Sequence, residues 1–310
     1  MRIVFFGSPS FAVPTLEALR AAGHDVGLVV SQPGKPVGRR AEITDPPVAS
    51  LAKSLGMHVF QPPTLKDDAA FARLAGERSD AFVVAAYGKI LARRVLDLPC
   101  LGCLNVHGSL LPRWRGASPV QAAILAGDSE TGVSIMGMEA GMDTGPVYTM
   151  RKTEIREDDD SASLGQRLAL LGADALVETL HFLEGEEGGT PVPQDDSLAT
   201  YCPKIDREDA RVDWTRPAAE MVRRARAFTP WPGLFTTRRN TRVKLSGLSL
   251  AAGRPRARPG EVLEADARVV VACGEGAVAV ATLQAEGRKA LPAADFVRGE
   301  RLASGETWGG

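Results

Sequence analysis

Three polar residues near the middle of the chain can together carry out acyl transfer. The stretch LNVHGSLLPRWRGASPVQ places Asn105 and His107 two residues apart at the end of an apolar run, and Asp143 follows in the glycine-punctuated segment EAGMDTGP. An amide can stabilise a developing oxyanion, an imidazole can transfer a proton, and a carboxylate can orient the imidazole. These residue types therefore point to acyl-transfer chemistry.

The elements that must position these residues alternate between strand and helix. Apolar runs predict strands at 2–6, 26–30, 81–86, 101–106 and 132–138, and helices are expected at 47–55, 67–76, 119–126 and 163–183. Strands that are apolar on both faces and alternate with helices indicate an α/β fold with a largely parallel sheet. Asn105 and His107 then stand on one side of a strand, at its carboxyl end, where open α/β sheets bind ligands.

Each of these residues also has a purely structural explanation. His107 can be a buried histidine with satisfied ring nitrogens, and Asn105 can be a turn residue. Asp143 taken alone fits better as an aspartate that caps a loop. The stretch PRWRG just after His107 favours function, because two arginines and a tryptophan can hold a flat heterocycle and its acidic tail by stacking and charge.

Two weaker motifs bear on other kinds of site. The first turn, GSPSFA from Gly7 to Ala12, lacks the second glycine that lets a backbone approach a pyrophosphate, which argues against NAD binding. Cys100 and Cys103 form a CxxC, the pattern of half a zinc site or of a redox pair. No second pair completes a zinc site, so we expect no metal.

Length and composition place the chain among ordinary globular proteins. Its 310 residues suggest about two domains, and 44% hydrophobic with 24% charged residues is typical of that class. The chain has no run near the roughly 20 apolar residues of a membrane span. The opening MRIVFFGSPS has too short an apolar run for a signal peptide, so we expect a cytoplasmic protein with no membrane partner.

A change in character marks two domains. Residues 1–187 hold the α/β pattern, residues 188–204 are polar and rich in Gly and Pro and are expected to form a linker, and residues 205–310 form a second domain. In that domain we expect a helix at 217–228 and short strands at 243–250, 260–263, 268–272 and 278–283, which predict a small β-barrel or sandwich. The tail after Arg301, rich in Gly, Ser and Thr, is expected to fray.

The second domain is basic. Residues 205–310 contain 18 Lys and Arg against 13 Asp and Glu, whereas residues 1–204 contain 19 against 25. The stretch from Met221 to Gly260 has ten basic residues and no acidic one. A charge run is usually a solvated face, but forty residues without an acid fit better with a surface that contacts nucleic-acid phosphates.

A second basic segment lies in the loop 31–44, which contains Lys35, Arg39 and Arg40. It is long for a connection between a strand and a helix, and long loops are often functional. A solvated surface loop explains its composition equally well.

Several motifs together carry a resemblance to a known family. The stretch NVHGSLLPRWRGASPVQ, followed by TGVSIM and GMDTG, is similar to the signature of the folate-dependent formyltransferases. The opening GSPSFA, the loop SQPGKPVGR, the segment AYGKIL and the late AFTPWPG extend this resemblance nearly end to end, to those members that act on a charged tRNA. Relatives that formylate glycinamide ribonucleotide resemble only the first part and lack the basic C-terminal domain.

The resemblance implies a substrate pair and a fold. The donor would be 10-formyltetrahydrofolate and the acceptor the α-amino group of methionine on initiator Met-tRNA. Separately, we expect a monomer. The fold would be α/β, with a Rossmann-like, mostly parallel sheet domain followed by a small OB-like β-barrel domain. The catalytic roles carry over onto Asn105, His107 and Asp143. Asn105 and His107 would stabilise the oxyanion of the tetrahedral intermediate, and Asp143 would orient the imidazole.

The resemblance also implies binding residues. Folate contacts carry over onto Ser109, Leu110, Leu111 and Pro112, with Tyr87 and Gly88 beside them. Contacts to tRNA are expected from Lys35, Arg39, Arg40, Arg223, Arg226, Arg238, Arg239, Arg242 and Lys244.

Three other functions stay open on the sequence alone. The chain can be a folate-dependent formyltransferase for a small amine, such as a sugar nucleotide or glycinamide ribonucleotide, but the basic C-terminal domain argues against it. It can be an RNA-binding protein on an inactive enzyme scaffold, against which the complete set of Asn, His and Asp argues. A nucleotide-dependent oxidoreductase is the third, and a lack of NAD binding would dismiss it.

Overall fold

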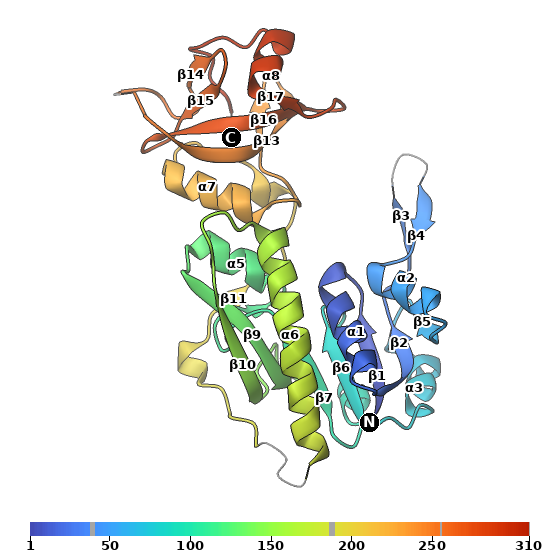
Figure 1. Cartoon of the computed structure of the whole chain (residues 1–310). Helices are drawn as coiled ribbons and strands as arrows, with labels where there is room; N and C mark the ends of the chain where they lie inside the picture. The colour runs from blue at the N-terminus through green and yellow to red at the C-terminus, as the bar shows by residue number, and fades with distance from the viewer. Residues whose placement is uncertain (38–40, 186–189, 255, 310) are drawn as a thin grey trace. The chain divides into compact units, whose positions relative to one another are not determined.

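The computed structural model describes residues 1–37, 41–185, 190–254 and 256–309, and its elements are shown in Figure 1. The chain packs into two compact units. The first unit comprises Met1–Pro119, Glu130–Glu154 and Gly165–Pro203, and the second comprises Val120–Ser129, Ile155–Leu164 and Lys204–Gly310. No helix in the described ranges is both long and apolar enough to cross a membrane.

A seven-stranded sheet forms the centre of the first unit. Its strands are β1 (Arg2–Gly7), β2 (Asp25–Val30), β5 (Val59–Phe60), β6 (Ala81–Ala85), β7 (Cys103–His107), β9 (Glu130–Gly137) and β10 (Val147–Glu154), in the order β10-β9-β7-β6-β1-β2-β5. The five strands from β7 to β5 are parallel, whereas β9 runs antiparallel to both β7 and β10. This mostly parallel sheet confirms the fold class expected for the first part of the chain.

The strands form where apolar residues follow one another without a break. All five residues of β6, AFVVA, are buried, as are five of the six residues of β1. Burial on both faces requires helices on both sides of the sheet. In the first unit these are α1 (Val13–Ala21) after the 3-10 turn Ser10–Ala12, α2 (Pro47–Ser54), α3 (Asp68–Ala75), α4 (Arg93–Leu96) and most of α6 (Ser161–Glu184). Helix α5 (Pro119–Ala126) falls almost entirely in the second unit.

Helix α6 packs tightly on the strand that carries the candidate residues. A Cβ atom at Gly172 would lie 2.6 Å from Cγ1 of Val106, so only glycine lets the helix backbone approach β7 this closely. The helix therefore supports the strand directly beside His107.

The sequence did not predict several strands of the first unit, namely β5, β10 and the short strands Lys35–Val37, Glu42–Thr44, Arg115–Gly116 and Tyr201–Cys202. Strand β10 (VYTMRKTE) is polar at most positions, because it is an edge strand whose burial alternates, and it lacks the apolar run of a central strand. The loop 31–44 contains a short hairpin, β3 (Lys35–Val37) and β4 (Glu42–Thr44).

The described part of the expected linker packs onto the first unit. Strand β11 (Tyr201–Cys202) pairs in parallel with β8 (Arg115–Gly116), the strand that follows β7 in the chain. Further back, Val147 and Val192 exchange two backbone hydrogen bonds of 2.8 Å, and a 3-10 turn spans Asp196–Leu198. Residues 190–203 are therefore structured by tertiary contacts, although their composition is that of a loop.

The second unit contains an antiparallel sheet. Its strands are β12 (Phe235–Arg238), β13 (Thr241–Ala251), β14 (Val262–Ala265), β15 (Val269–Ala272), β16 (Ala277–Ala285) and β17 (Leu291–Pro292). A 3-10 turn at Glu208–Ala210 and helix α7 (Ala218–Ala227) precede these strands, and helix α8 (Ala293–Glu300) follows them. The sheet order is β12-β13-β16-β15-β14, with β17 beside β16. Four of these strands and α7 match the predicted segments.

The C-terminal tail closes this sheet into a barrel. Gly309 pairs with Thr237 in β12, and Thr307 pairs with Glu261 just before β14, so the tail joins the two edge strands. Trp308 is 2% exposed, with its ring centroid 6.2 Å from that of Trp214. The expectation that the tail frays was wrong, because one large aromatic side chain and strand pairing hold it in place.

Candidate active site

The candidate catalytic residues lie at the carboxyl edge of the parallel sheet. Strand β7 pairs with β6 through Asn105 and Val84, so the segments that follow both strands emerge at the same edge. The strand order reverses at β1, with β2 on one side and β6 on the other. Ligands of open α/β sheets bind outside the carboxyl ends of strands near such a reversal.

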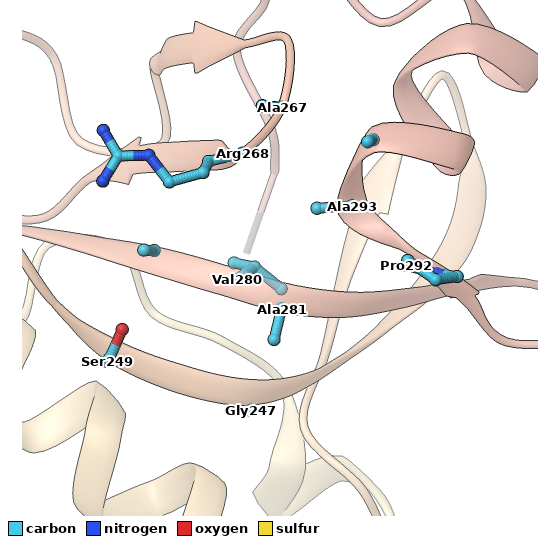
Figure 2. Close-up of a pocket in the computed structure, with 10 residues that line it drawn as sticks. Gly247, Ser249, Ala267, Arg268, Val280, Ala281, Pro292 and Ala293 are labelled. Carbon is cyan, nitrogen blue, oxygen red and sulfur yellow. The ribbon is translucent and has the colours of Figure 1, made fainter.

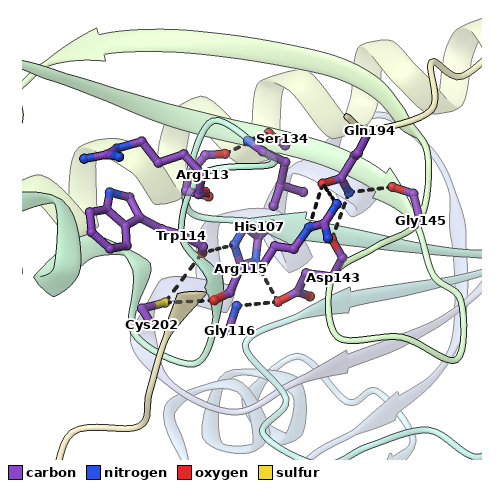
Figure 3. A network of polar contacts seen from close by, with 12 residues as sticks. His107, Arg113, Trp114, Arg115, Gly116, Ser134, Asp143, Gly145, Gln194 and Cys202 are labelled. Atoms are coloured by element: carbon purple, nitrogen blue, oxygen red, sulfur yellow. Dashed lines mark hydrogen bonds and ion pairs between the residues drawn. The ribbon is translucent and has the colours of Figure 1, made fainter. Parts of the chain in front are cut away.

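The imidazole of His107 is buried between a carbonyl and a carboxylate (Figure 3). Its Nε2 lies 2.9 Å from the backbone carbonyl oxygen of Trp114, and its Nδ1 lies 3.7 Å from Oδ2 of Asp143. A carbonyl only accepts hydrogen bonds, so Nε2 must carry the hydrogen. The Trp114 carbonyl therefore selects the tautomer, and Nδ1 is left to exchange a proton beside Asp143.

Hydrogen bonds within the loop and from two distant strands fix the loop that supplies the Trp114 carbonyl. Ser109 donates its hydroxyl to the Arg113 carbonyl at 2.6 Å, and Ser134 donates to the Ser109 carbonyl at 2.7 Å. The thiol of Cys202 lies 3.5 Å from the Trp114 carbonyl oxygen. Burial raises the pKa of that thiol, which keeps it neutral and able to donate.

Asp143 is held from the opposite side of the site. Its Oδ2 accepts a hydrogen bond from the backbone N–H of Gly116 at 2.8 Å, and its backbone has a φ of 52°. A residue with a side chain rarely adopts this left-handed backbone conformation without support from its surroundings. The carboxylate is thus aimed at His107 by contacts outside its own loop.

The amide of Asn105 is available for a ligand. Asn105 is half-buried on β7, two residues before His107, and strand alternation directs both side chains to one face. Within the described ranges, its side-chain amide makes no hydrogen bond to the protein. Asn105 thus lies on the same strand face as the imidazole that meets Asp143. The catalytic roles of Asn105, His107 and Asp143 stay predictions.

The proposed folate residues after β7 form a compact turn. Ser109 is fully buried, so its hydroxyl shapes the turn, and Leu111 packs with Met136 and Val147. The backbone N–H of Leu111 donates to the Ser134 hydroxyl, and the Pro112 carbonyl accepts from Thr200. Leu110 is half-buried. The turn is therefore a rigid edge beside His107.

Tyr87 and Gly88 follow β6 at the same edge of the sheet. The Tyr87 side chain is 2% exposed and packs edge-on against Phe6 at 5.4 Å, so it faces the core. Its hydroxyl has no hydrogen-bond partner among the described residues, and burial raises the pKa of Tyr87 to about 12. Gly88 is exposed with a φ of 79°. Of the two, the backbone of Gly88 is the part that can meet a ligand.

Sequence reasoning missed most of the groups that orient the site. These are the backbone groups of Trp114 and Gly116 and two residues of the segment 190–203, Gln194 and Thr200. The interpretation of the PRWRG arginines as ligand-binding residues was wrong for Arg115, because its side chain is 1% exposed and bonded to the protein. The cation–π contact of Arg113 over the Trp114 ring, at 4.4 Å, is the part that sequence reasoning could find.

Several of the proposed tRNA-binding arginines make hydrogen bonds within the second unit. Arg238 is 5% exposed and bonds to both carboxylate oxygens of Glu306, so we leave it out of any binding surface. Arg223 donates to the Leu125 carbonyl. Arg226 donates to the carbonyls of Asp159 and Arg156, both at 2.6 Å.

Other basic side chains remain on the surface. Arg239 is 63% exposed, and the side chain of Lys244 is exposed and makes no hydrogen bond or ion pair within the described ranges. Arg242 is 33% exposed and stacks over Phe235 at 3.4 Å. In the first unit Lys35 is exposed on β3, and Arg39 and Arg40 lie outside the described residues.

The CxxC motif of Cys100 and Cys103 gains no support from the structure as a metal or redox site. Cys100 is exposed, Cys103 is buried, and both are free. In the part of the chain that the structure describes, no three His, Cys, Asp or Glu side chains gather closely enough to hold a metal ion.

A concavity of about 330 Å³ lies on the barrel, between β13, β16 and the start of α8 (Figure 2). Its lining is mostly small, with Gly247, Ala281 and Ala293 among it. The charged residue at its rim, Arg268, is paired with Glu264 at 2.8 Å. We assign it no ligand.

Comparison with known families defines the class of protein. Residues 1–180 match the family model described as formyl transferase, and residues 204–301 match that of the formyl transferase C-terminal domain. The Asn, His and Asp site at the edge of the Rossmann-like sheet lies within the first match. Fold, site and both models together define a formyltransferase.

Full-length relatives narrow the family further. The chain is 49% identical over 302 residues to the methionyl-tRNA formyltransferase of Stutzerimonas stutzeri, covering 97% of this chain and 95% of the relative. It is 47% identical over 310 residues to that of Dechloromonas aromatica, covering 99% and 98%. The chain therefore belongs to the methionyl-tRNA formyltransferase family.

A solved structure shares the fold. The structure of HypX from Aquifex aeolicus in complex with tetrahydrofolic acid superposes with a TM-score of 0.66 at 20% identity. The match covers 96% of this chain and 47% of that protein, so the chain spans about half of its length.

Proposed function

We propose that this chain transfers the formyl group of 10-formyltetrahydrofolate to the α-amino group of methionine on initiator methionyl-tRNA. The observation that carries the proposal is the site geometry. His107 is fixed between the Trp114 carbonyl and Asp143, beside the unpaired amide of Asn105. Membership of the family supports the choice of substrates.

The proposed chemistry starts from an amine that is easily freed. An α-amino group has a reference pKa of about 7.7–8.0, and the adjacent ester of a charged tRNA lowers it. The neutral amine attacks the formyl carbon, a C–N bond forms, and the carbonyl oxygen becomes an oxyanion. Asn105 donates a hydrogen bond to this oxygen, and His107 does so from Nδ1 after it has taken the proton that the attacking amine loses.

His107 also moves the proton that the reaction displaces. The amine loses a proton as it becomes an amide, and the bond from the formyl carbon to the folate nitrogen breaks. That nitrogen leaves well only when it is protonated, and Nδ1 of His107, directly or through a water, delivers the proton. Asp143 stabilises the imidazolium that exists between these two transfers.

The folate is proposed to bind along the sheet edge, against the turn from Ser109 to Pro112 and the exposed backbone at Gly88. Both segments follow neighbouring parallel strands, so a flat ring laid between them lies next to Asn105. The rigid turn favours a preformed pocket, since its hydrogen bonds are already made within the protein.

The tRNA is proposed to bind through exposed basic side chains by phosphate contacts. In the second unit these are Arg239, Arg242 and Lys244, and in the loop 31–44 the exposed side chain is Lys35. Arg39 and Arg40, which lie outside the described residues, are proposed from the sequence to belong to the same set. In this proposal residues 1–187 carry the chemistry, residues 188–204 connect, and residues 205–310 hold the tRNA. The enzyme acts as a monomer in the cytoplasm, where translation supplies the charged tRNA.

The test is a comparison of acceptors. Formyl transfer from 10-formyltetrahydrofolate is measured to initiator methionyl-tRNA and, in parallel, to glycinamide ribonucleotide and an amino sugar nucleotide. Transfer to the charged tRNA alone supports the proposal. Transfer only to a small amine would preserve the catalytic interpretation and refute the role given to the basic barrel.

A further inference from the structure

The segment 190–203 reaches the catalytic site through one glutamine. Gln194 donates from Nε2 to the carbonyl oxygens of Asp143 at 2.8 Å and Gly145 at 2.7 Å. Its Oε1 accepts two hydrogen bonds from the guanidinium of Arg115, at 2.8 and 3.0 Å (Figure 3). One amide thus ties the loop that carries the catalytic carboxylate to the strand that follows the catalytic turn.

The partners of Gln194 leave its amide only one orientation. A guanidinium only donates hydrogen bonds, so the atom that faces Arg115 must be the amide oxygen. The amide nitrogen then faces the two carbonyls, which only accept. Both ends of the side chain are matched to their partners, and turning the amide over would break four hydrogen bonds.

Arg115 is built to hold this glutamine. Its side chain is 1% exposed and also pairs at 2.7 Å with Asp196, an exposed carboxylate, so the buried guanidinium has a countercharge at the surface. Its two chain neighbours contact the catalytic pair directly. The Trp114 carbonyl accepts from His107, and the Gly116 N–H donates to Asp143.

The Asp143 loop has little else to hold it. It contains two glycines, Met142 is 62% exposed, and Asp143 itself has a left-handed backbone. Gln194 bonds to the loop on both sides of Thr144, at the carbonyls of residues 143 and 145. The pair of hydrogen bonds between Val147 and Val192 fixes the segment two residues from Gln194.

We infer that Gln194, supported by Arg115, is a positioning residue that holds the Asp143 carboxylate against His107 for formyl transfer. The inference rests on the proposed function. It makes part of the expected linker a component of the active site. Nδ1 of His107 and Oδ2 of Asp143 are 3.7 Å apart, just beyond hydrogen-bond distance, so a further displacement of the loop prevents the hydrogen bond that orients the imidazole.

The decisive variant is Gln194→Glu. It keeps the length of the side chain and gives Arg115 a charged partner, so a purely structural tie between the segment and Arg115 is retained. It replaces the donating nitrogen with an oxygen that repels the carbonyls of Asp143 and Gly145. We expect kcat for methionyl-tRNA to fall about 10- to 100-fold, with KM for both substrates nearly unchanged.

Two further variants separate positioning from general damage. Asp195→Asn is the matched control, since the side chain of Asp195 bonds only to Ser197 in the described structure and Asp195 lies one residue from Gln194. Its kcat should stay at the wild-type value. In an Asp143→Asn background, Gln194→Glu should cost little more, because its effect passes through Asp143. Wild-type kcat in Gln194→Glu, or losses that multiply in the double variant, would overturn the inference.

A spectroscopic readout separates this inference from the proposed function. The chain has four histidines, so ¹⁵N-labelled histidine gives few side-chain signals, and His107→Ala assigns that of His107. Gln194→Glu should move the Nδ1 resonance of His107 in the same direction as Asp143→Asn. An unmoved resonance in a folded Gln194→Glu protein, or in Gln194→Met if the first variant does not fold, refutes the positioning role. A wild-type enzyme that fails to formylate methionyl-tRNA refutes only the proposed function.

Discussion

Gly116 offers a sharp test of how the two sides of the active site are joined. Its backbone has a φ of 120°, which residues other than glycine rarely adopt, and its N–H donates a hydrogen bond to Oδ2 of Asp143 at 2.8 Å. A Cβ atom at this position would lie 2.2 Å from the backbone carbonyl oxygen of Cys202. Gly116→Ala must therefore displace either β8 or β11, and with it the donor to Asp143.

The magnitude follows from these contacts. The unfavourable backbone conformation alone costs about 1–3 kcal/mol. A backbone carbonyl cannot swing away as a flexible side chain can, so relief of the overlap also weakens the 3.1 Å bond from Ala117 N–H to the Cys202 carbonyl, at about 1 kcal/mol. We expect the free energy of unfolding to fall by roughly 2–4 kcal/mol. A shift of about 1 Å at Asp143 lowers kcat by up to about 100-fold.

The assay combines urea unfolding with formyl-transfer kinetics below the unfolding transition. Gly23→Ala is the control, because Gly23 also has a positive φ, of 81°, but an added Cβ meets nothing within 4 Å. That variant should lose only about 1 kcal/mol and keep its kcat. If Gly116→Ala loses no more stability than Gly23→Ala, or keeps its kcat, the reasoning about this junction is refuted.

Three other changes have defined outcomes. Asn105→Ala should lower kcat about 100- to 1000-fold with little change in KM in steady-state kinetics, since its amide acts on the oxyanion; a change confined to KM would contradict this. Lys244→Ala should reduce the slope of log affinity for tRNA against log salt by about 1 in filter binding, and an unchanged slope excludes a phosphate contact. Tyr87→Phe should be as stable as the wild type or about 1 kcal/mol more stable at pH 7, because it removes a buried hydroxyl without a partner. Burial raises the pKa of Tyr87 to about 12 from about 10, so the wild type should lose stability between these pH values in chemical unfolding, and Tyr87→Phe should lose less.

The sequence predicted the parts of the site that depend on local pattern. An apolar run ending in Asn105 and His107 is enough to place both on one face of a strand, at the ligand-binding edge. The groups that orient His107 are different in kind. The Trp114 carbonyl is a backbone atom, and its position depends on a turn that Ser134 and Cys202 complete from distant strands.

Gln194 shows why a segment with the composition of a linker can contain a residue that contacts the active site. Its segment is polar and has no apolar period, because its structure comes from docking against Arg115 and Val147 and not from a core face of its own. Such contacts leave no pattern along the chain. Only a tertiary structure pairs residues 115 and 194.

The basic stretch from Met221 to Gly260 illustrates a different limit. It contains no acid, but Glu306 neutralises Arg238 from 68 residues away, and Glu208 pairs with Arg242 from 34 residues before it. A count of charged residues within one stretch of sequence omits the acidic partners, Glu306 and Glu208, that the folded barrel places beside these arginines. The prediction of a phosphate-binding surface therefore rests on fewer side chains than the composition suggests.

The most direct test of the account is single-turnover formyl transfer to methionyl-tRNA by the wild type and by His107→Ala, with tRNA binding measured on the same proteins. If Nδ1 of His107 moves the proton, the variant should bind tRNA normally and transfer formyl about 100- to 10,000-fold more slowly. Transfer at the wild-type rate in His107→Ala would contradict the mechanism, whatever the substrate proves to be.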